Sequence, residues 1–179
     1  MSEMHQPIPR VVVATTALAR GNVGEESAKA VVEELLAAKF TYVRSVVVNR
    51  DAQYISELVS HVSNDNEADA IVVVGGTGFG PRDHTCEALD SLFDRRIEGF
   101  AEAYRVLLRD IGSGPSSILA RAIAGVYNKC LVVALPRSEI PLRRAMRELV
   151  VPVLAEAALL ACGRPLGQRP PTPAPSGWL

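Results

Sequence analysis

The sequence predicts an α/β protein with three layers, α/β/α, in which a mostly parallel central sheet lies between helices. Strand and helix patterns alternate along the chain, and this order favours parallel strands with helices covering both faces of the sheet. One strand candidate, 70–74, ends in three consecutive valines, as expected for a strand buried on both faces. The chain has 179 residues, 48% of them hydrophobic, which is enough for one domain with a core.

The individual elements follow from the periodicity of the apolar residues. Runs of β-branched and apolar residues predict strands at 10–15, 42–48, 70–74 and 130–135. Apolar residues at helical spacing predict helices around 28–36, 55–62, 85–93 and 99–108. We also expect a helix over 116–124, with Gly125 just after its end, and a long helix over 139–162 that is bent or interrupted at Pro152.

These elements define one domain with two extensions. We expect an N-terminal arm at 1–9, a ligand-binding domain at 10–163 and a tail at 164–179. The tail is rich in proline and has no periodic apolar face, which predicts a disordered or extended segment.

Composition excludes several classes of function. A net charge of -1 argues against a nucleic-acid partner, which would favour a basic surface. No apolar run approaches the roughly 20 residues that cross a membrane, and the first residues do not resemble a signal peptide. Three widely spaced cysteines suit a reducing compartment. We therefore expect a cytoplasmic protein.

The most informative segment is the glycine-rich stretch that follows the strand at 70–74. Gly75, Gly76, Gly78 and Gly80 fall within six residues, and such a loop beside a helix N-terminus exposes backbone amides to an anion. It lacks the lysine of a P-loop and the GxGxxG spacing of a dinucleotide site. A flexible turn is the plainer interpretation of such glycines.

Charged residues near this loop suggest phosphate chemistry. Asp83 suits Mg²⁺ held on a nucleotide phosphate, although it or Thr85 would equally cap the next helix. Asp51 follows the second strand and is an equally good helix cap, and 136–138 follows the last strand. Carboxyl ends of parallel strands share one edge, where ligands bind. Arg121, expected on an apolar helix, either extends along the surface, pairs with a carboxylate or faces an anion.

Three stretches resemble one family. The segment 75–88, GGTGFGPRDHTCEA, is similar to the GGTGxxxRDxTPEA signature of the MoaB/Mog molybdopterin-binding family. The segment 92–100, LFDRRIEGF, is similar to the family's DREVEGF-like stretch. The segment 119–125, LARAIAG, is similar to its [SA]RAxAG stretch. In element order the resemblance covers residues 10–162.

The resemblance implies an α/β fold that assembles as a homotrimer or a homohexamer, with other proteins of the cofactor pathway as further partners. It implies a molybdopterin site and, in active members, adenylylation of molybdopterin by Mg-ATP. The matching catalytic residues, which would also hold Mg²⁺, are Asp51 and Asp83. The residues implied in binding molybdopterin and the nucleotide are Gly75, Gly76, Thr77, Gly78, Arg82, Thr85, Arg121 and Ser138.

The chain departs from this family in two loops. The family's Ser-Asp and Asp-x-Ser-Gly motifs are missing from 14–28, and Arg137 and Glu139 replace a glycine and a proline of the family's loop after the last strand. Cys86 also stands where the family has a proline. These departures leave open a non-catalytic relative that binds a pterin or a protein partner and acts as a regulatory module.

Overall fold

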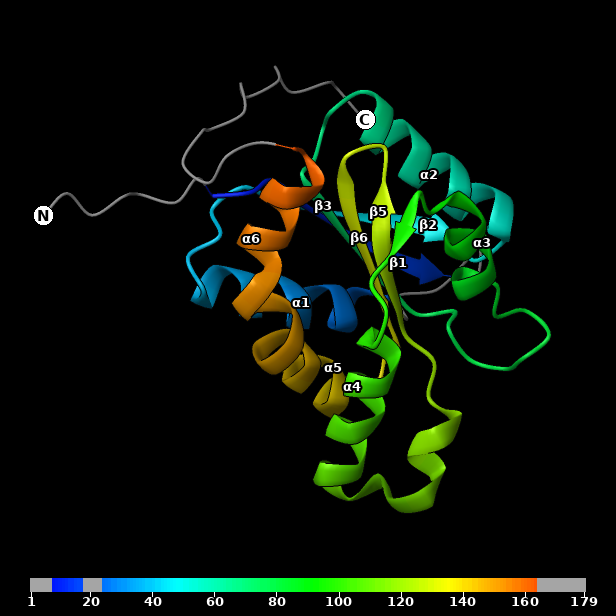
Figure 1. Ribbon diagram of the computed structural model, residues 1–179. Coiled ribbons are helices and arrows are strands. Elements are labelled where there is room, and N and C mark those ends of the chain that lie inside the picture. Colours follow the sequence, from blue (N-terminus) through cyan, green and yellow to red (C-terminus); the bar gives the residue numbers. More distant parts are fainter. Residues whose placement is uncertain (1–7, 18–23, 164–179) are drawn as a thin grey trace, which may run out of the picture.

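A six-stranded sheet forms the centre of the molecule (Figure 1). The computed structural model describes residues 8–17 and 24–163. The strands lie in the order β2-β1-β3-β6-β5-β4, with β2, β1, β3 and β6 parallel and the last two pairings antiparallel. The strands are β1 (Val11–Ala17), β2 (Val43–Asn49), β3 (Ala70–Val74), β4 (Arg95–Arg96), β5 (Ile123–Tyr127) and β6 (Cys130–Leu135). The expected mostly parallel sheet is confirmed.

Helices cover both faces of this sheet, which gives the expected three layers (Figure 1). One face carries α1 (Glu25–Ala37), α4 (Phe100–Leu108), α5 (Glu139–Ala145) and α6 (Val151–Ala161). The other carries α2 (Ala52–Asn64) and α3 (Thr85–Leu92). Alternate residues of β1 point to opposite faces, so Val11 and Val13 pack under the first layer and Val12 and Ala14 under the second.

The expected helix over 116–124 is wrong. A 3₁₀ helix, η2, covers Gly114–Leu119, and the chain then extends into β5. Ile123 and Ala124 pair with β6 as an antiparallel strand. At Gly125 a side chain would lie 2.6 Å from the ring of Phe93. Pairing with β6 and close packing at Gly125 thus override the local helical spacing.

The C-terminal helical region is continuous, but its hydrogen-bond pattern changes before Pro152. A π-helical turn, η3 (Met146–Val150), separates α5 from α6, and another, η1 (Arg109–Ser113), follows α4. Pro152 lies in the first turn of α6, directly after this π-helical turn, and a proline at such a position removes one backbone hydrogen bond to the preceding turn. The expected interruption is therefore confirmed and begins a few residues earlier than the proline.

The other expected strands and helices match the observed ones to within about three residues, and the short strand β4 was not expected. Tyr104, 1% exposed, belongs to the core, and Phe100 packs against it. The expected arm and tail lie mostly or wholly outside the described residues. Among the helices that are described, none is long and apolar enough to cross a bilayer.

Candidate functional site

Three loops meet at the carboxyl edge of the parallel strands. In the register of the sheet, Ala17 pairs with Asn49, Thr15 with Val74, and Val74 with Leu135. The chain leaves β2, β3 and β6 at the same edge, as the sequence predicted. We call this region the glycine-loop edge and define it as residues 75–83 together with Thr16, Arg50 and Arg137.

The loop after β3 depends on glycine for both conformation and space. Gly75 and Gly76 have φ angles of +96° and +66°, in the left-handed region. A Cβ atom on Gly75 would lie 2.6 Å from Nη2 of Arg137, and one on Gly76 would overlap Oγ1 of Thr85. Buried Thr85 holds the loop by donating a 2.8 Å hydrogen bond to the carbonyl of Gly75.

Several amides of this loop are left for a ligand. The Gly75 amide donates to Leu135 and the Gly80 amide to Oδ2 of Asp83, 3.2 Å away. Within the described residues, the amides of Gly76, Thr77 and Gly78 donate to no protein acceptor. Amides in such a loop, next to the first turn of α3, suit an anionic group.

Two arginines make the glycine-loop edge electropositive. Nη1 of Arg50 lies 3.8 Å from Oδ1 of Asp83, and both side chains are about one-fifth exposed. Nε of Arg50 is buried and has no hydrogen-bond partner. Arg137 donates through Nη2 to the carbonyl of Thr16. Burial lowers the pKa of Arg137, and the positive charge of Arg50 lowers it further, while Asp83 opposes the shift. The two cations outnumber the one carboxylate between them, so an added anion is favoured here.

Neither Arg50 nor Thr16 was predicted as a site residue, and Arg137 appeared only as a departure from the family. Asp51 was predicted because it follows the second strand and therefore lies at the carboxyl edge of the sheet. The same reasoning applies to its neighbour Arg50. Only the packing shows which of the two reaches Asp83.

The other predicted site residues lie around this edge in different environments. Asp51 occupies the N-cap position of α2 and is exposed, and its side chain makes no capping hydrogen bond. Ser138 occupies the N-cap position of α5 and is exposed as well. Arg82 is exposed on the loop, and His84, rather than Asp83, precedes α3. Asp83 therefore faces Arg50 instead of capping the helix.

Arg121 joins the glycine loop to a neighbouring cavity. It lies on the extended segment before β5, so its expected place on a helix is wrong. Its Nη1 donates 3.0 Å to the carbonyl of Gly78, its Nη2 pairs with Glu87, and its guanidinium stacks on Phe79, 5.1 Å from the ring centroid. Burial opposes its charge, but Glu87, Cys86 and Asp83 together outweigh burial and raise the pKa of Arg121. Of the roles left open, the structure shows pairing with a carboxylate.

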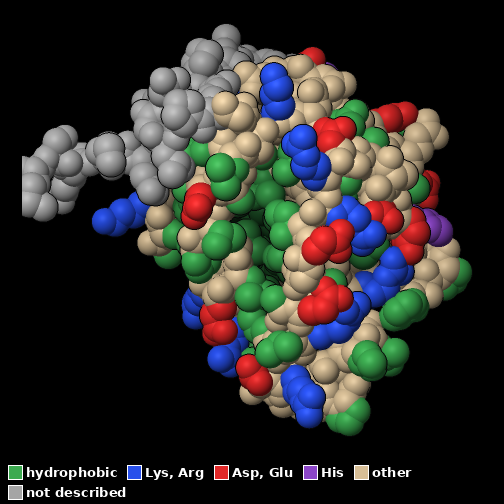
Figure 2. All heavy atoms as spheres, viewed as in Figure 1, with side chains coloured by type: hydrophobic (Ala, Val, Ile, Leu, Met, Phe, Trp, Pro, Cys, Tyr) green, Lys and Arg blue, Asp and Glu red, His purple; other side chains and the backbone are tan. Residues whose placement is uncertain are grey.

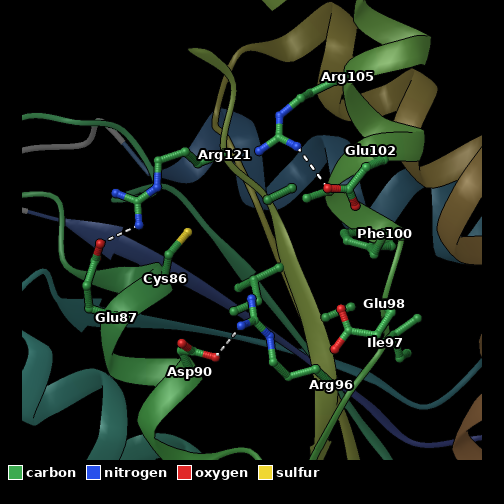
Figure 3. Close-up of a pocket in the computed structure, with 15 residues that line it drawn as sticks. Cys86, Glu87, Asp90, Arg96, Ile97, Glu98, Phe100, Glu102, Arg105 and Arg121 are labelled. Carbon is green, nitrogen blue, oxygen red and sulfur yellow. Dashed lines mark hydrogen bonds and ion pairs between the residues drawn. The ribbon is translucent and has the colours of Figure 1, made fainter. Parts of the chain in front are cut away.

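The cavity beyond Arg121 has a volume of about 260 Å³ and lies between α3, β4 and the start of α4 (Figure 3). We call it the β4–α4 cavity. Its apolar lining includes Cys86, Ile97, Phe100 and Ile123. Figure 2 shows acidic and basic side chains alternating over this part of the surface.

A group of metal-ligating side chains lies elsewhere. His61, Asp65 and Glu67, at the end of α2, bring ligand atoms within 4.8 Å of one another. Glu67 is held by Arg44 at 2.7 Å, and His61 pairs with Asp65 at 3.1 Å. Their mutual contacts are those of an ion-pair cluster, which precedes β3, whereas the glycine loop follows that strand.

Comparisons with known proteins agree on one family. Residues 10–156 match the family model described as "Probable molybdopterin binding domain". The chain is 32% identical over 146 residues to molybdenum cofactor biosynthesis protein B of Escherichia coli K12, covering 81% of this chain and 85% of the relative.

Solved structures give the same result. A crystal structure of molybdenum cofactor biosynthesis protein B matches with a TM-score of 0.78 at 28% identity, covering 87% of this chain and 96% of the other. A molybdopterin biosynthesis protein from Mycobacterium abscessus matches with a TM-score of 0.77 at 32% identity, covering 88% and 98%. On its sequence, its sheet order and its glycine loop, the chain belongs to the MoaB/Mog family of molybdenum cofactor biosynthesis proteins, with their molybdopterin-binding domain.

Proposed function

We propose that this chain binds molybdopterin with its phosphate at the glycine-loop edge and adenylylates that phosphate with Mg-ATP. The observation that carries the proposal is the set of amides at Gly76, Thr77 and Gly78 that have no acceptor in the described protein, next to the cations Arg50 and Arg137. Charge neutralisation and alignment are what phosphoryl and adenylyl transfer chiefly require.

The reaction balances without a protein nucleophile. An oxygen of the molybdopterin phosphate forms a bond to the α-phosphorus of ATP, the bond between that phosphorus and the bridging oxygen to the β-phosphorus breaks, and pyrophosphate leaves with the electron pair. The loop amides and the two arginines would hold phosphate oxygens. Mg²⁺ arrives with ATP as part of the substrate.

Asp83 and Asp51 offer the oxygen ligands that Mg²⁺ prefers. Asp83 is the better placed of the two, because its Oδ2 is fixed by the Gly80 amide while Oδ1 faces the edge near Arg50. Asp51 is exposed beside Arg50. We propose that Asp83 orients the metal–nucleotide complex and that Asp51 contributes from the rim, together with Arg82 and Ser138.

One observation favours a second candidate function, binding without turnover. Asp83 already faces Arg50, and the side chain of Arg137 lies against Gly75. A protein with these contacts would hold the pterin phosphate while the carboxylate stays engaged by arginine. It would then act as a pterin-binding or regulatory module.

Incubation of the purified protein with molybdopterin, ATP and Mg²⁺ separates the two functions. We expect pyrophosphate release and an adenylylated pterin that chromatography resolves. An adenylylating member of the family serves as the positive control. Saturable molybdopterin binding without product, while the control turns over, would leave only the second function, and absence of binding would remove both.

We also propose that the chain assembles as a homotrimer or homohexamer. Val153 and Leu160 of α6 are 50% and 68% exposed, and Figure 2 shows hydrophobic side chains gathered in a hollow between α6 and the strands β5 and β6. Such apolar surface is typical of subunit contacts. Sedimentation equilibrium at micromolar concentration tests this, and a monomer would contradict it.

A further inference from the structure

Phe79 is an exposed aromatic residue in the middle of the glycine loop, and 71% of its surface is accessible to solvent. Single exposed apolar residues are common on proteins and carry no meaning by themselves. Ile118 and Ile140, for example, are exposed to a similar degree. Phe79 differs from them in what its ring contacts and in where its backbone lies.

The ring of Phe79 is held by a fixed cation. The guanidinium of Arg121 lies over the ring, 5.1 Å from its centroid. That guanidinium is itself anchored, because Nη1 donates to the carbonyl of Gly78 at 3.0 Å and Nη2 pairs with Glu87 (Figure 3). A cation is attracted to the face of an aromatic ring. The ring is therefore oriented before a ligand arrives, and its exposure leaves the face opposite Arg121 open to solvent.

The backbone on both sides of Phe79 closes around the carboxylate of Asp83. A Cβ atom on Gly78 would lie 2.7 Å from Oδ2 of Asp83, and one on Gly80 would lie 2.8 Å from it. The Gly80 amide donates to this oxygen, whereas the Gly78 amide has no acceptor in the described part of the chain. The ring thus projects from the same turn that presents an anion-binding amide and a carboxylate suited to Mg²⁺.

An open aromatic face beside an anion site suits a ligand that carries both phosphates and a flat base. Every nucleobase has a π-face, so bases stack on aromatic side chains whatever their hydrogen-bonding edge. Stacking on Phe79 would also lose little side-chain entropy, because Arg121 already orders the ring. A nucleoside triphosphate combines the two parts in one molecule.

We propose that Phe79 is the residue on which the base of the nucleotide stacks, with Arg121 on the other face of the ring. The choice of ATP among nucleotides rests on the proposed function. The stack contacts the area of the base rather than its edge, so it favours a purine over a pyrimidine and does little to distinguish adenine from guanine.

Nucleotide binding in the absence of molybdopterin tests the stack without any reaction. Isothermal titration calorimetry compares Mg-ATP with Mg-tripolyphosphate, which has the phosphates but no base. Mg-ATP should bind the original protein about 10-fold more tightly than Mg-tripolyphosphate. Phe79→Ala should weaken Mg-ATP about 10-fold and leave Mg-tripolyphosphate unchanged. The loss should be smaller for Mg-CTP, because a pyrimidine offers less area to the ring.

Phe79→Trp and Leu36→Ala are the control variants. Tryptophan keeps a flat face for Arg121 and for the base, so Phe79→Trp should bind Mg-ATP at least as tightly as the original protein. Leu36 is 53% exposed and lies in the last turn of α1, which runs back to the edge of the sheet where β2 begins. Leu36→Ala removes an exposed apolar side chain far from the glycine loop and should bind Mg-ATP normally.

Each outcome decides the assignment. Equal affinity of the original protein for Mg-ATP and Mg-tripolyphosphate, or unchanged Mg-ATP binding in Phe79→Ala, would overturn the stack, as would absence of binding of both ligands. Unchanged Mg-ATP binding with an altered oligomeric state of Phe79→Ala in sedimentation equilibrium would assign the ring to a subunit contact.

The proposed function is decided separately, by turnover of molybdopterin. Adenylylation that proceeds equally well in Phe79→Ala at low ATP concentration would remove the stack and leave the proposed function standing. Base-dependent Mg-ATP binding that requires Phe79, without adenylyl transfer, would support the stack and exclude the enzyme.

Discussion

The glycine-loop edge and the β4–α4 cavity lie on two sides of Arg121 and are built in different ways. At the edge, backbone geometry dominates: Gly75 and Gly76 adopt positive φ angles, and neighbouring side chains fill the space that a Cβ would need. In the cavity, side chains dominate, and its one glycine, Gly99, has φ +81° with no atom within 4 Å of a Cβ position.

The charges differ in the same way. The edge holds the partly buried Arg50 and Arg137 and the exposed Arg82 with one carboxylate, Asp83, whereas each arginine that lines the cavity has its own acidic partner. The edge is therefore suited to a phosphate, and the cavity is suited to a neutral ligand.

The largest expected effect is at the edge. Asp83→Ala should lower adenylyl transfer about 1000-fold, since the charge that orients the metal–nucleotide complex is lost. Asp83→Asn should do the same while keeping an acceptor for the Gly80 amide. Product formation is measured, with the circular dichroism spectrum as the folding control. Normal turnover in Asp83→Asn would refute the role of this carboxylate.

The next effect concerns the cavity wall. Burial raises the pKa of the Cys86 thiol to about 11, so the thiolate forms only as the pH rises toward that value and is scarce at pH 8. Alkylation of Cys86 at pH 8 should be about 100-fold slower than that of glutathione. Peptide mass spectrometry over a time course gives the rate. Rapid labelling of Cys86 would show that the wall opens to water.

Glycine substitutions compare the two regions directly. Gly76→Ala should destabilise the fold by about 2–4 kcal/mol, because the positive φ and the overlap with Thr85 both cost energy. Gly99→Ala meets no atom within 4 Å and should cost about 1 kcal/mol, the conformational term alone. Urea unfolding at constant pH measures both. Equal losses of unfolding free energy in the two variants would mean that Gly76 is no more closely packed than Gly99.

The smallest expected effect is on anion affinity. Arg137→Gln should weaken binding of inorganic pyrophosphate about 10-fold, since one of the two cations of the edge is lost. Arg144→Gln, on the exposed surface of α5, should leave it unchanged. Isothermal titration calorimetry measures both variants. Equal affinity in the two variants would show that Arg137 does not contribute to anion binding at the edge.

Local patterns predicted most of the fold. Local spacing of apolar residues predicted α1, α2 and α4, and runs of valine predicted β1, β3 and β6. These patterns involve residues only a few positions apart, so they can be recognised in the sequence. The stretch 116–124 has a helical apolar spacing too, yet Ile123 and Ala124 join the sheet. Its partner strand follows a tight turn and is itself buried, and the gain from completing the sheet exceeds the local preference.

The candidate site likewise has features that the sequence predicted and features that it did not. The positions of the glycine loop, Asp51 and 136–138 at one edge followed from parallel strand order alone. The pairing of Asp83 with Arg50, and the contact of Arg137 with Thr16, did not. Both join residues that are more than 30 positions apart, and no local pattern encodes them.

The sequence by itself determined the layered α/β architecture, the glycine loop and the family. Each of these depends on the spacing of nearby residues or on a contiguous motif. Only the tertiary structure decided which charges meet. It placed Arg121 between the loop and a cavity and paired it with Glu87. The energies of such pairs depend on distance and burial in three dimensions, and these arise only when separate segments pack together.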